Sequence, residues 1–163
     1  MPMPASYELF VDRELFVVRW RNPTEEGAHA LALEVEKQHR EIGVPLVFVF
    51  VVGSDCPPPS KQTAEVMLRR HERVYDITQT VRAVVLGGSL RQTVMRSVMT
   101  AMTLAAGLRG QPFAVDKTME ELARVVQHML GRDADQLLRA MVANGIINTD
   151  EAGLTVQDAA ESA

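Results

Sequence analysis

Seven consecutive apolar residues, Leu46–Val52, form the clearest pattern in the chain. Gly53 ends the run, and a polar, proline-rich segment follows it. A strand with one face in solvent alternates apolar and polar residues, whereas an unbroken β-branched and aromatic run indicates a strand covered on both faces. The run therefore predicts a sheet between layers of helices. It also directs attention to the C-terminal ends of the strands, where such folds bind ligands.

The rest of the chain alternates between short apolar runs and amphipathic segments. Further strands are expected at Tyr7–Val11, Leu15–Trp20, Val81–Leu86 and Pro112–Val115. Helices are expected from Asn22 to Gly43, after Ser60, from Ser89 to about Ala106, from Thr118 to Gly131, and from Asp133 to about Ala143. The first two strands are separated by a short polar break and predict a hairpin. The order predicts an α/β sandwich with a mixed sheet of about five strands, an N-terminal β-hairpin, four helices and an appended C-terminal helix.

Charge and composition exclude several classes of function. The net charge is −4, and the four acidic residues that account for it lie in residues 149–163, where there is no basic residue. The remainder is balanced, so neither a nucleic-acid groove nor a basic membrane-surface helix is indicated. A single cysteine excludes a disulfide framework. With no signal peptide pattern and no membrane span, we expect a cytoplasmic protein.

Three loops are expected to meet at the C-terminal edge of the sheet, spanning residues 53–60, 87–91 and 116–118. Helix N-termini carry free N–H groups and a partial positive charge, so this edge is a candidate anion or ligand site. Its candidate residues are Gly87, Gly88, Ser89, Arg91 and Lys61. In the alternative interpretation the two glycines make a tight turn and Ser89 only caps a helix, because the full phosphate-loop motif is missing.

No pattern points to catalysis. Cys56 lies in the proline-rich loop, but no histidine is near it in sequence to act as its base. His39 and His71 fall on apolar helix faces and are expected at the rim of the core rather than at a metal ion. We therefore predict a non-enzymatic protein without a metal or another cofactor.

The helix expected after Ser89 is apolar on two faces. One face holds Val94, Val98, Ala101 and Ala105, and the other is a stripe of Met95, Met99 and Met102. Such a helix needs two partners, of which the sheet is one. The second is a neighbouring helix of the same domain, another copy of the chain, or a different protein. Because methionine suits adaptable contacts, the methionine stripe is the candidate interaction surface. Alternatively, Leu137, Leu138, Met141, Ile146 and Ile147 cover this stripe within the same chain.

Element order and two segments resemble bacterial STAS-like domains, which are typified by anti-sigma-factor antagonists. The segments are VRWRNPTEE (18–26) and VRAVVLGGSLRQTVMRSVMTAMTLA (81–105), and a helix beginning TMEEL follows. The resemblance implies a STAS-like domain over residues 1–131. Outside the resemblance, the residue pattern predicts an appended helix at 132–147 and an acidic, flexible tail at 148–163. The resemblance also implies a phosphoacceptor at Ser54 or Ser60, although Ser54 precedes Asp55 here, whereas the family motif has the aspartate first.

These observations favour a non-enzymatic interaction or regulatory module that acts through an apolar helix surface, with a protein partner or a second copy of itself. The alternative is a protein that binds a small molecule or an anion at the C-terminal ends of its strands.

Overall fold

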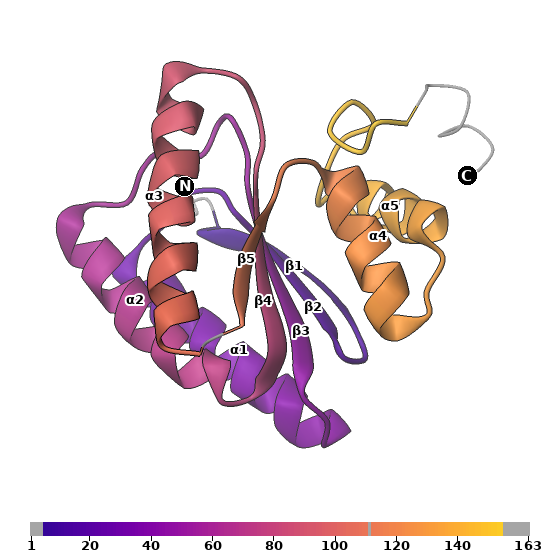
Figure 1. The fold of residues 1–163 in the computed structure, drawn as a ribbon, viewed down its shortest axis with the longest axis horizontal. Helices are drawn as coiled ribbons and strands as arrows, with labels where there is room; N and C mark the ends of the chain where they lie inside the picture. The colour runs from indigo at the N-terminus through magenta and orange to yellow at the C-terminus, as the bar shows by residue number, and fades with distance from the viewer. Residues whose placement is uncertain (1–4, 111, 155–163) are drawn as a thin grey trace.

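The computed structural model describes residues 5–110 and 112–154 (Figure 1). Its elements are β1 (Tyr7–Asp12), β2 (Leu15–Trp20), α1 (Glu25–Ile42), β3 (Leu46–Val52), α2 (Lys61–Tyr75), β4 (Thr78–Val85), α3 (Leu90–Leu108), β5 (Phe113–Asp116), α4 (Met119–Leu130) and α5 (Ala134–Ala143). The strands form one sheet in the order β1-β2-β3-β4-β5. β1 is antiparallel to β2, and the later pairs are parallel. The predicted α/β fold with a mixed sheet and an N-terminal hairpin is confirmed.

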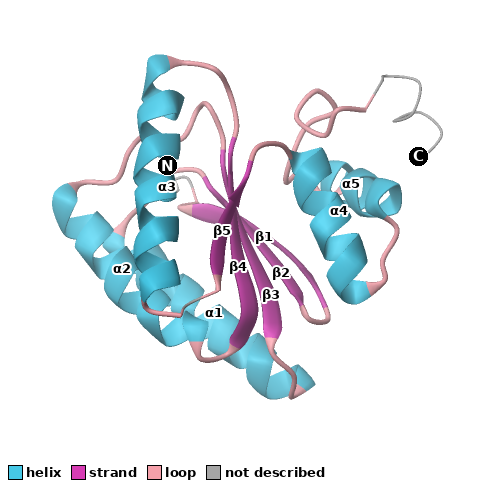
Figure 2. Ribbon diagram, viewed as in Figure 1, coloured by secondary structure: helices cyan, strands magenta, loops and turns pink. Residues whose placement is uncertain are grey.

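Helices cover both faces of the sheet (Figures 1 and 2). α1, α2 and α3 lie on one face, and α4 and α5 lie on the other. Each of the first three helices joins one parallel strand to the next in the same direction across the sheet. Crossovers of a single hand then place all three helices on the same side. Only after β5, at the edge of the sheet, does the chain pass to the opposite face.

β3 supplies the centre of two hydrophobic cores. All seven of its residues are buried. Phe48 and Phe50 pack into the core beneath α1 to α3, while Val47, Val49 and Val51 pack into the core beneath α4 and α5. Alternate side chains of a strand point to opposite faces, so an unbroken apolar run is the sequence that both cores require.

α5 does not cover the methionine stripe of α3, so that alternative is wrong. Leu137, Leu138 and Met141 instead pack in the core beneath α4, on the far face of the sheet. The turns that follow α5 belong to this core as well, since Ile146 and Ala152 are buried. Part of the segment predicted to be a flexible tail, residues 148–154, is therefore packed, and residues 155–163 lie outside the described residues.

Several element ends differ from their predicted positions. α1 begins at Glu25, and its cap is Thr24 rather than Asn22: the Thr24 hydroxyl accepts a hydrogen bond of 3.0 Å from Gly27 N. Pro23 therefore precedes the cap. α3 extends through Gly107 to Leu108, whereas the sequence predicted an end at about Ala106. A glycine weakens a helix but does not have to end it. The predicted capping residues Ser60 and Thr118 are confirmed.

Candidate functional site

The C-terminal ends of β3 and β4 bring two loops into contact. Gln92 Nε2, from the first turn of α3, donates a hydrogen bond of 3.0 Å to the carbonyl of Gly53. Gly87 adopts a φ of 92°, and a Cβ there would lie 2.9 Å from Ser54 Cβ. Close approach of the two loops therefore depends on a glycine at position 87. Lys117, from the third loop, and Gly87 both line a shallow depression at this edge of the sheet.

The candidate anion site at this edge has most of its polar groups engaged. Ser89 accepts a hydrogen bond from Gln92 N at 3.3 Å, as a helix cap does, and its hydroxyl donates one of 2.9 Å to Gln92 Oε1. Gly88 and Arg91 are exposed. This geometry matches the alternative interpretation of a tight turn followed by a helix cap.

Another arginine at this edge, Arg96, donates hydrogen bonds to backbone carbonyls at the end of β4 and in the loop that follows it. Arg96 Nη2 donates to the carbonyl of Val85 at 2.9 Å and also to the carbonyl of Gly87. Asp150 and Glu151 line the same depression and add negative charge. Arg96 is therefore engaged by backbone carbonyls, and ligand binding at this edge stays a prediction.

The two candidate phosphoacceptors and Lys61 lie on the β3–α2 connection. Ser54 is exposed next to Gly87, and Lys61 is exposed at the start of α2. Ser60 is the cap of α2: its hydroxyl accepts from Thr63 N at 3.1 Å and donates to Thr63 Oγ1 at 3.0 Å. Modification of Ser60 would replace that cap with a phosphate at a helix N-terminus, which the helix dipole tolerates. The phosphoacceptor role stays a prediction for both serines.

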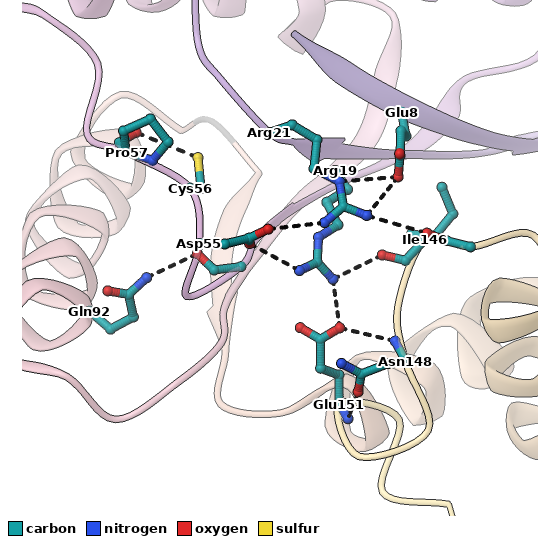
Figure 3. A network of polar contacts seen from close by, with 12 residues as sticks. Glu8, Arg19, Arg21, Asp55, Cys56, Pro57, Gln92, Ile146, Asn148 and Glu151 are labelled. Atoms are coloured by element: carbon teal, nitrogen blue, oxygen red, sulfur yellow. Dashed lines mark hydrogen bonds and ion pairs between the residues drawn. The ribbon is translucent and has the colours of Figure 1, made fainter. Parts of the chain in front are cut away.

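A buried arginine cluster links this edge to the C-terminal turns (Figure 3). Arg19 Nη1 donates to Glu151 Oε1 at 2.7 Å and to the Ile146 carbonyl at 3.0 Å, and Arg19 Nη2 contacts Asp55 Oδ1 at 3.3 Å. A Cβ at Gly53 would collide with the Arg19 guanidinium. Sequence reasoning missed this cluster, although a charge within the apolar strand Leu15–Trp20 was the signal that could have found it.

Charges in the Arg19 cluster affect Asp55. Burial by itself would raise the pKa of Asp55, but backbone hydrogen bonding and the positive charges of Arg19 and Arg21 lower that pKa below its ordinary value. Arg21 also donates to Glu8 Oε2 at 2.8 Å. The two arginines are thus matched by carboxylates, and the cluster is a structural tie rather than a vacant anion site.

Cys56 is buried where a thiolate is unfavourable. Burial, and then the negative charge of Asp55, raise the pKa of the Cys56 thiol to about 11. Its Sγ contacts the carbonyl of Pro57 at 3.5 Å (Figure 3). A nucleophilic cysteine requires the opposite, a lowered pKa in an electropositive and accessible site. The geometry therefore gives a catalytic Cys56 no support.

We expect Cys56 to react slowly with thiol reagents in the native protein. A pKa near 11 leaves roughly 200-fold less thiolate at pH 8 than an ordinary cysteine has, and burial slows access further. The measurement is the rate of labelling by a chromogenic disulfide at pH 8, with the denatured chain as the fast control. Stoichiometric labelling of the native protein at the rate of the denatured chain would contradict the assignment.

The methionine stripe of α3, predicted to be the interaction surface, faces the core, and the other apolar face is exposed. Met95 and Met99 are half-buried and pack against the core beneath α1 to α3. The side chain of Met102 lies outside the described residues. The exposed surface, called here the outer α3 face, consists of Leu90, Val94, Val98, Ala101, Leu104, Ala105 and Leu108. Val98 is 50% exposed and Leu104 is 68% exposed.

An apolar groove lies between α2 and α3. Its volume is about 170 Å³, and Trp20, Phe50, Met67, Met95 and Met99 contribute to its walls. Pro23 and the proline-rich loop after β3 also line it. The groove therefore lies beside the loop edge predicted from sequence, but its lining is almost entirely apolar.

His71 is a polar residue in the lining of the groove. Its ring lies edge-on against Phe48 and Phe50, with centroids 5.9 and 5.4 Å away. Burial lowers the pKa of His71 to about 4, so the imidazole is neutral at pH 7. Neither a charged ligand nor a metal ion would find a charged partner in this groove.

No family model, curated protein or solved structure matches the chain. Within residues 5–110 and 112–154, no group of three or more His, Cys, Asp and Glu side chains is arranged to hold a metal ion. In that same part of the chain, none of the helices combines the length and the apolar character needed to cross a bilayer. The STAS-like resemblance thus stays a prediction.

Proposed function

We propose that this chain is a non-enzymatic interaction module that pairs with a second copy of itself through the outer α3 face. The observation that carries the proposal is a row of exposed apolar side chains on α3: Val94, Val98, Ala101, Ala105 and Leu108. Their spacings of four and three residues are those of a helix–helix seam. An exposed apolar stripe of this kind is typical of an interaction site rather than of a free surface.

The polar residues of α3 also suit an apolar contact. Residues 97–108 contain no charged side chain. The hydroxyls of Ser97, Thr100 and Thr103 each donate to the carbonyl four residues earlier, at 3.1, 2.9 and 3.0 Å. The O–H donors of these residues are satisfied within the helix and stay satisfied when water is removed. Two copies of the face bring no like charges together at its centre.

A STAS-like regulatory role is part of this proposal. Its support is the element order, a hairpin followed by three strand–helix crossovers, together with the segments that resemble that family. Such a module would work by exchanging one partner for another. Self-association through α3 is the first such interaction to test, because it requires no other protein.

We expect the protein to form a weak dimer that a charge on the outer α3 face disrupts. One helix face lies at the low end of the roughly 1,200–2,000 Å² that stable interfaces bury, so a micromolar Kd is expected. Ala101→Glu or Leu104→Glu would bury unpaired charges and weaken the dimer by roughly 100-fold or more. The measurement is solution mass by sedimentation equilibrium across concentration.

Leu33→Glu is the matched control. Leu33 is a 65% exposed leucine on α1 whose neighbours in sequence include Glu34 and Lys37, so the same change there should leave the dimer intact. A wild-type protein that stays monomeric at near-millimolar concentration would refute self-association. An equal effect of Leu33→Glu and Leu104→Glu would remove the assignment to α3.

A further inference from the structure

The apolar groove between α2 and α3 has the size of a small aromatic molecule. Its volume of about 170 Å³ is close to the ~150 Å³ of an apolar cavity that binds benzene. The walls combine two buried aromatic residues with flexible methionines: Trp20, Phe50, Met67, Met95 and Met99. Aromatic rings and methionine sulfurs both make favourable contacts with another aromatic ring. The walls therefore suit a flat, apolar ring.

The charge of the groove disfavours ionic ligands. Its described lining contains no Asp, Glu, Lys or Arg side chain. Its ionisable members are Cys56 and His71, and burial keeps both in their uncharged forms at pH 7, because it raises the pKa of the thiol and lowers that of the imidazole. A charged ligand would lose its hydration here without gaining an ion pair. An uncharged ligand avoids this cost.

One residue of the wall carries a polar group without a partner. Trp20 is 2% exposed, and its indole Nε1 is buried with no hydrogen-bond acceptor among the described residues. A buried tryptophan N–H usually has an acceptor, and an unpaired buried donor is unfavourable. The Tyr7 ring holds the indole edge-on, with centroids 5.5 Å apart, so the fold fixes the position of this donor. A ligand that brings an acceptor oxygen would supply the missing hydrogen bond.

We propose that the groove between α2 and α3 binds a small, uncharged aromatic molecule that carries a carbonyl oxygen, and that the Trp20 indole N–H donates a hydrogen bond to this oxygen. The imidazole of His71, which also lines the groove, adds one N–H donor and one acceptor nitrogen for a further polar substituent. Binding here is independent of the proposed self-association, because only Val98 of the outer α3 face lines the groove.

Acetophenone is the test ligand, with ethylbenzene and benzoate as matched controls. Ethylbenzene keeps the ring and the size but lacks the acceptor, and benzoate adds a charge. Acetophenone is expected to bind with a Kd of roughly 0.1–1 mM, a range suited to so few atoms. It should bind at least as tightly as ethylbenzene, because the indole N–H replaces the hydrogen bond that the carbonyl loses to water. Benzoate should not bind. Tighter binding of ethylbenzene than of acetophenone would overturn the proposal.

The indole N–H itself reports the hydrogen bond. Trp20 is the only tryptophan of the chain, so this group gives a single resonance in a ¹⁵N-labelled sample. Saturating acetophenone should move the indole proton downfield, as hydrogen bonding does, whereas ethylbenzene should not. An indole proton that acetophenone leaves in place would contradict the assignment of Trp20 as the donor.

Three variants locate the site. Ala64→Phe fills the groove from α2 and should abolish acetophenone binding, whereas Ala30→Phe, at an exposed position of α1 outside the lining, should leave the Kd unchanged. Ala101→Glu, which is expected to disrupt the dimer, should bind acetophenone as the wild type does. Retained binding in Ala64→Phe would overturn the placement in the groove, and lost binding in Ala101→Glu would assign the ligand to a contact between two copies. The indole shift of the wild type decides the question if Ala64→Phe does not fold.

Discussion

Replacing Arg19 by methionine is expected to destabilise the protein by about 3–5 kcal/mol, the usual effect of removing one partner from a buried ion pair. The Arg19 side chain is 6% exposed, and it holds the Glu151 carboxylate and the Ile146 carbonyl. Without the guanidinium, both acceptors remain in a site that water reaches poorly. The measurement is the free energy of unfolding in urea at pH 7, followed by Trp20 fluorescence.

Two variants test whether the effect comes from the buried pair. Arg19→Met with Glu151→Met removes both charges and should recover much of the loss, because two apolar side chains replace an ion pair without leaving either charge unpaired. Arg21→Met is the control: its side chain is 29% exposed and pairs with the half-exposed Glu8, so its loss should be less than about 1 kcal/mol. A loss below 1 kcal/mol for Arg19→Met itself would contradict the role given to the cluster.

The same cluster should govern local opening. Arg19 contacts Glu151 in the turns after α5 and Asp55 in the loop after β3 (Figure 3). It therefore connects these two segments. Glu151 also accepts from Asn148 N at 3.0 Å, and Asn148 Oδ1 accepts from Glu151 N at 2.8 Å. Loss of Arg19 should therefore raise amide exchange first in residues 146–152, before the strands lose protection.

His71 is expected to make the protein less stable as the pH falls from 6.5 to 4. The pKa of His71 is about 4 in the folded protein, against 6.5 for a free imidazole, because burial disfavours the charged ring. Between these values the unfolded chain binds the proton and the folded chain does not, so stability is complete above pH 6.5 and declines below it. The decline is on the order of 3 kcal/mol and levels off below about pH 4.

The test is a comparison of urea unfolding at pH 7 and at pH 4.5 in the wild type and in His71→Leu. Carboxylates titrate in both proteins, so the difference between them isolates the histidine. The variant should lose markedly less stability on acidification, while its stability at pH 7 should change little, since a leucine suits the apolar surroundings. His128→Gln, at an exposed position of α4, should behave like the wild type. Equal pH dependence in wild type and His71→Leu would show that protonation of His71 does not destabilise the folded protein.

Much of the fold was accessible from the sequence because it depends on local patterns. The unbroken run Leu46–Val52 can be buried only if both faces of its strand are covered, and the structure covers them. Glycine ends α1 and α4 in the left-handed conformation that other residues avoid. The cap of α1 was misplaced by two residues, since Asn22 and Thr24 suit a cap equally well in sequence. The hydrogen bond between the Ser6 and Thr24 hydroxyls is visible only in three dimensions.

The candidate site depended on contacts that sequence does not carry. Periodicity reveals that α3 has two apolar faces, but it does not say which one meets the sheet. The long methionines Met95 and Met99 pack against the core and line the groove, whereas of the outer α3 face only Val98 lines the groove. The carboxylate partners of Arg19, Asp55 and Glu151, lie 36 and 132 residues away along the chain, so no local sequence motif predicts them. The sequence by itself thus determined the strands, the helices and their layering, because these follow from which residues avoid water. Only the tertiary structure decided which apolar face stays exposed, which arginine is buried and where the groove opens, because those depend on how distant segments fit together.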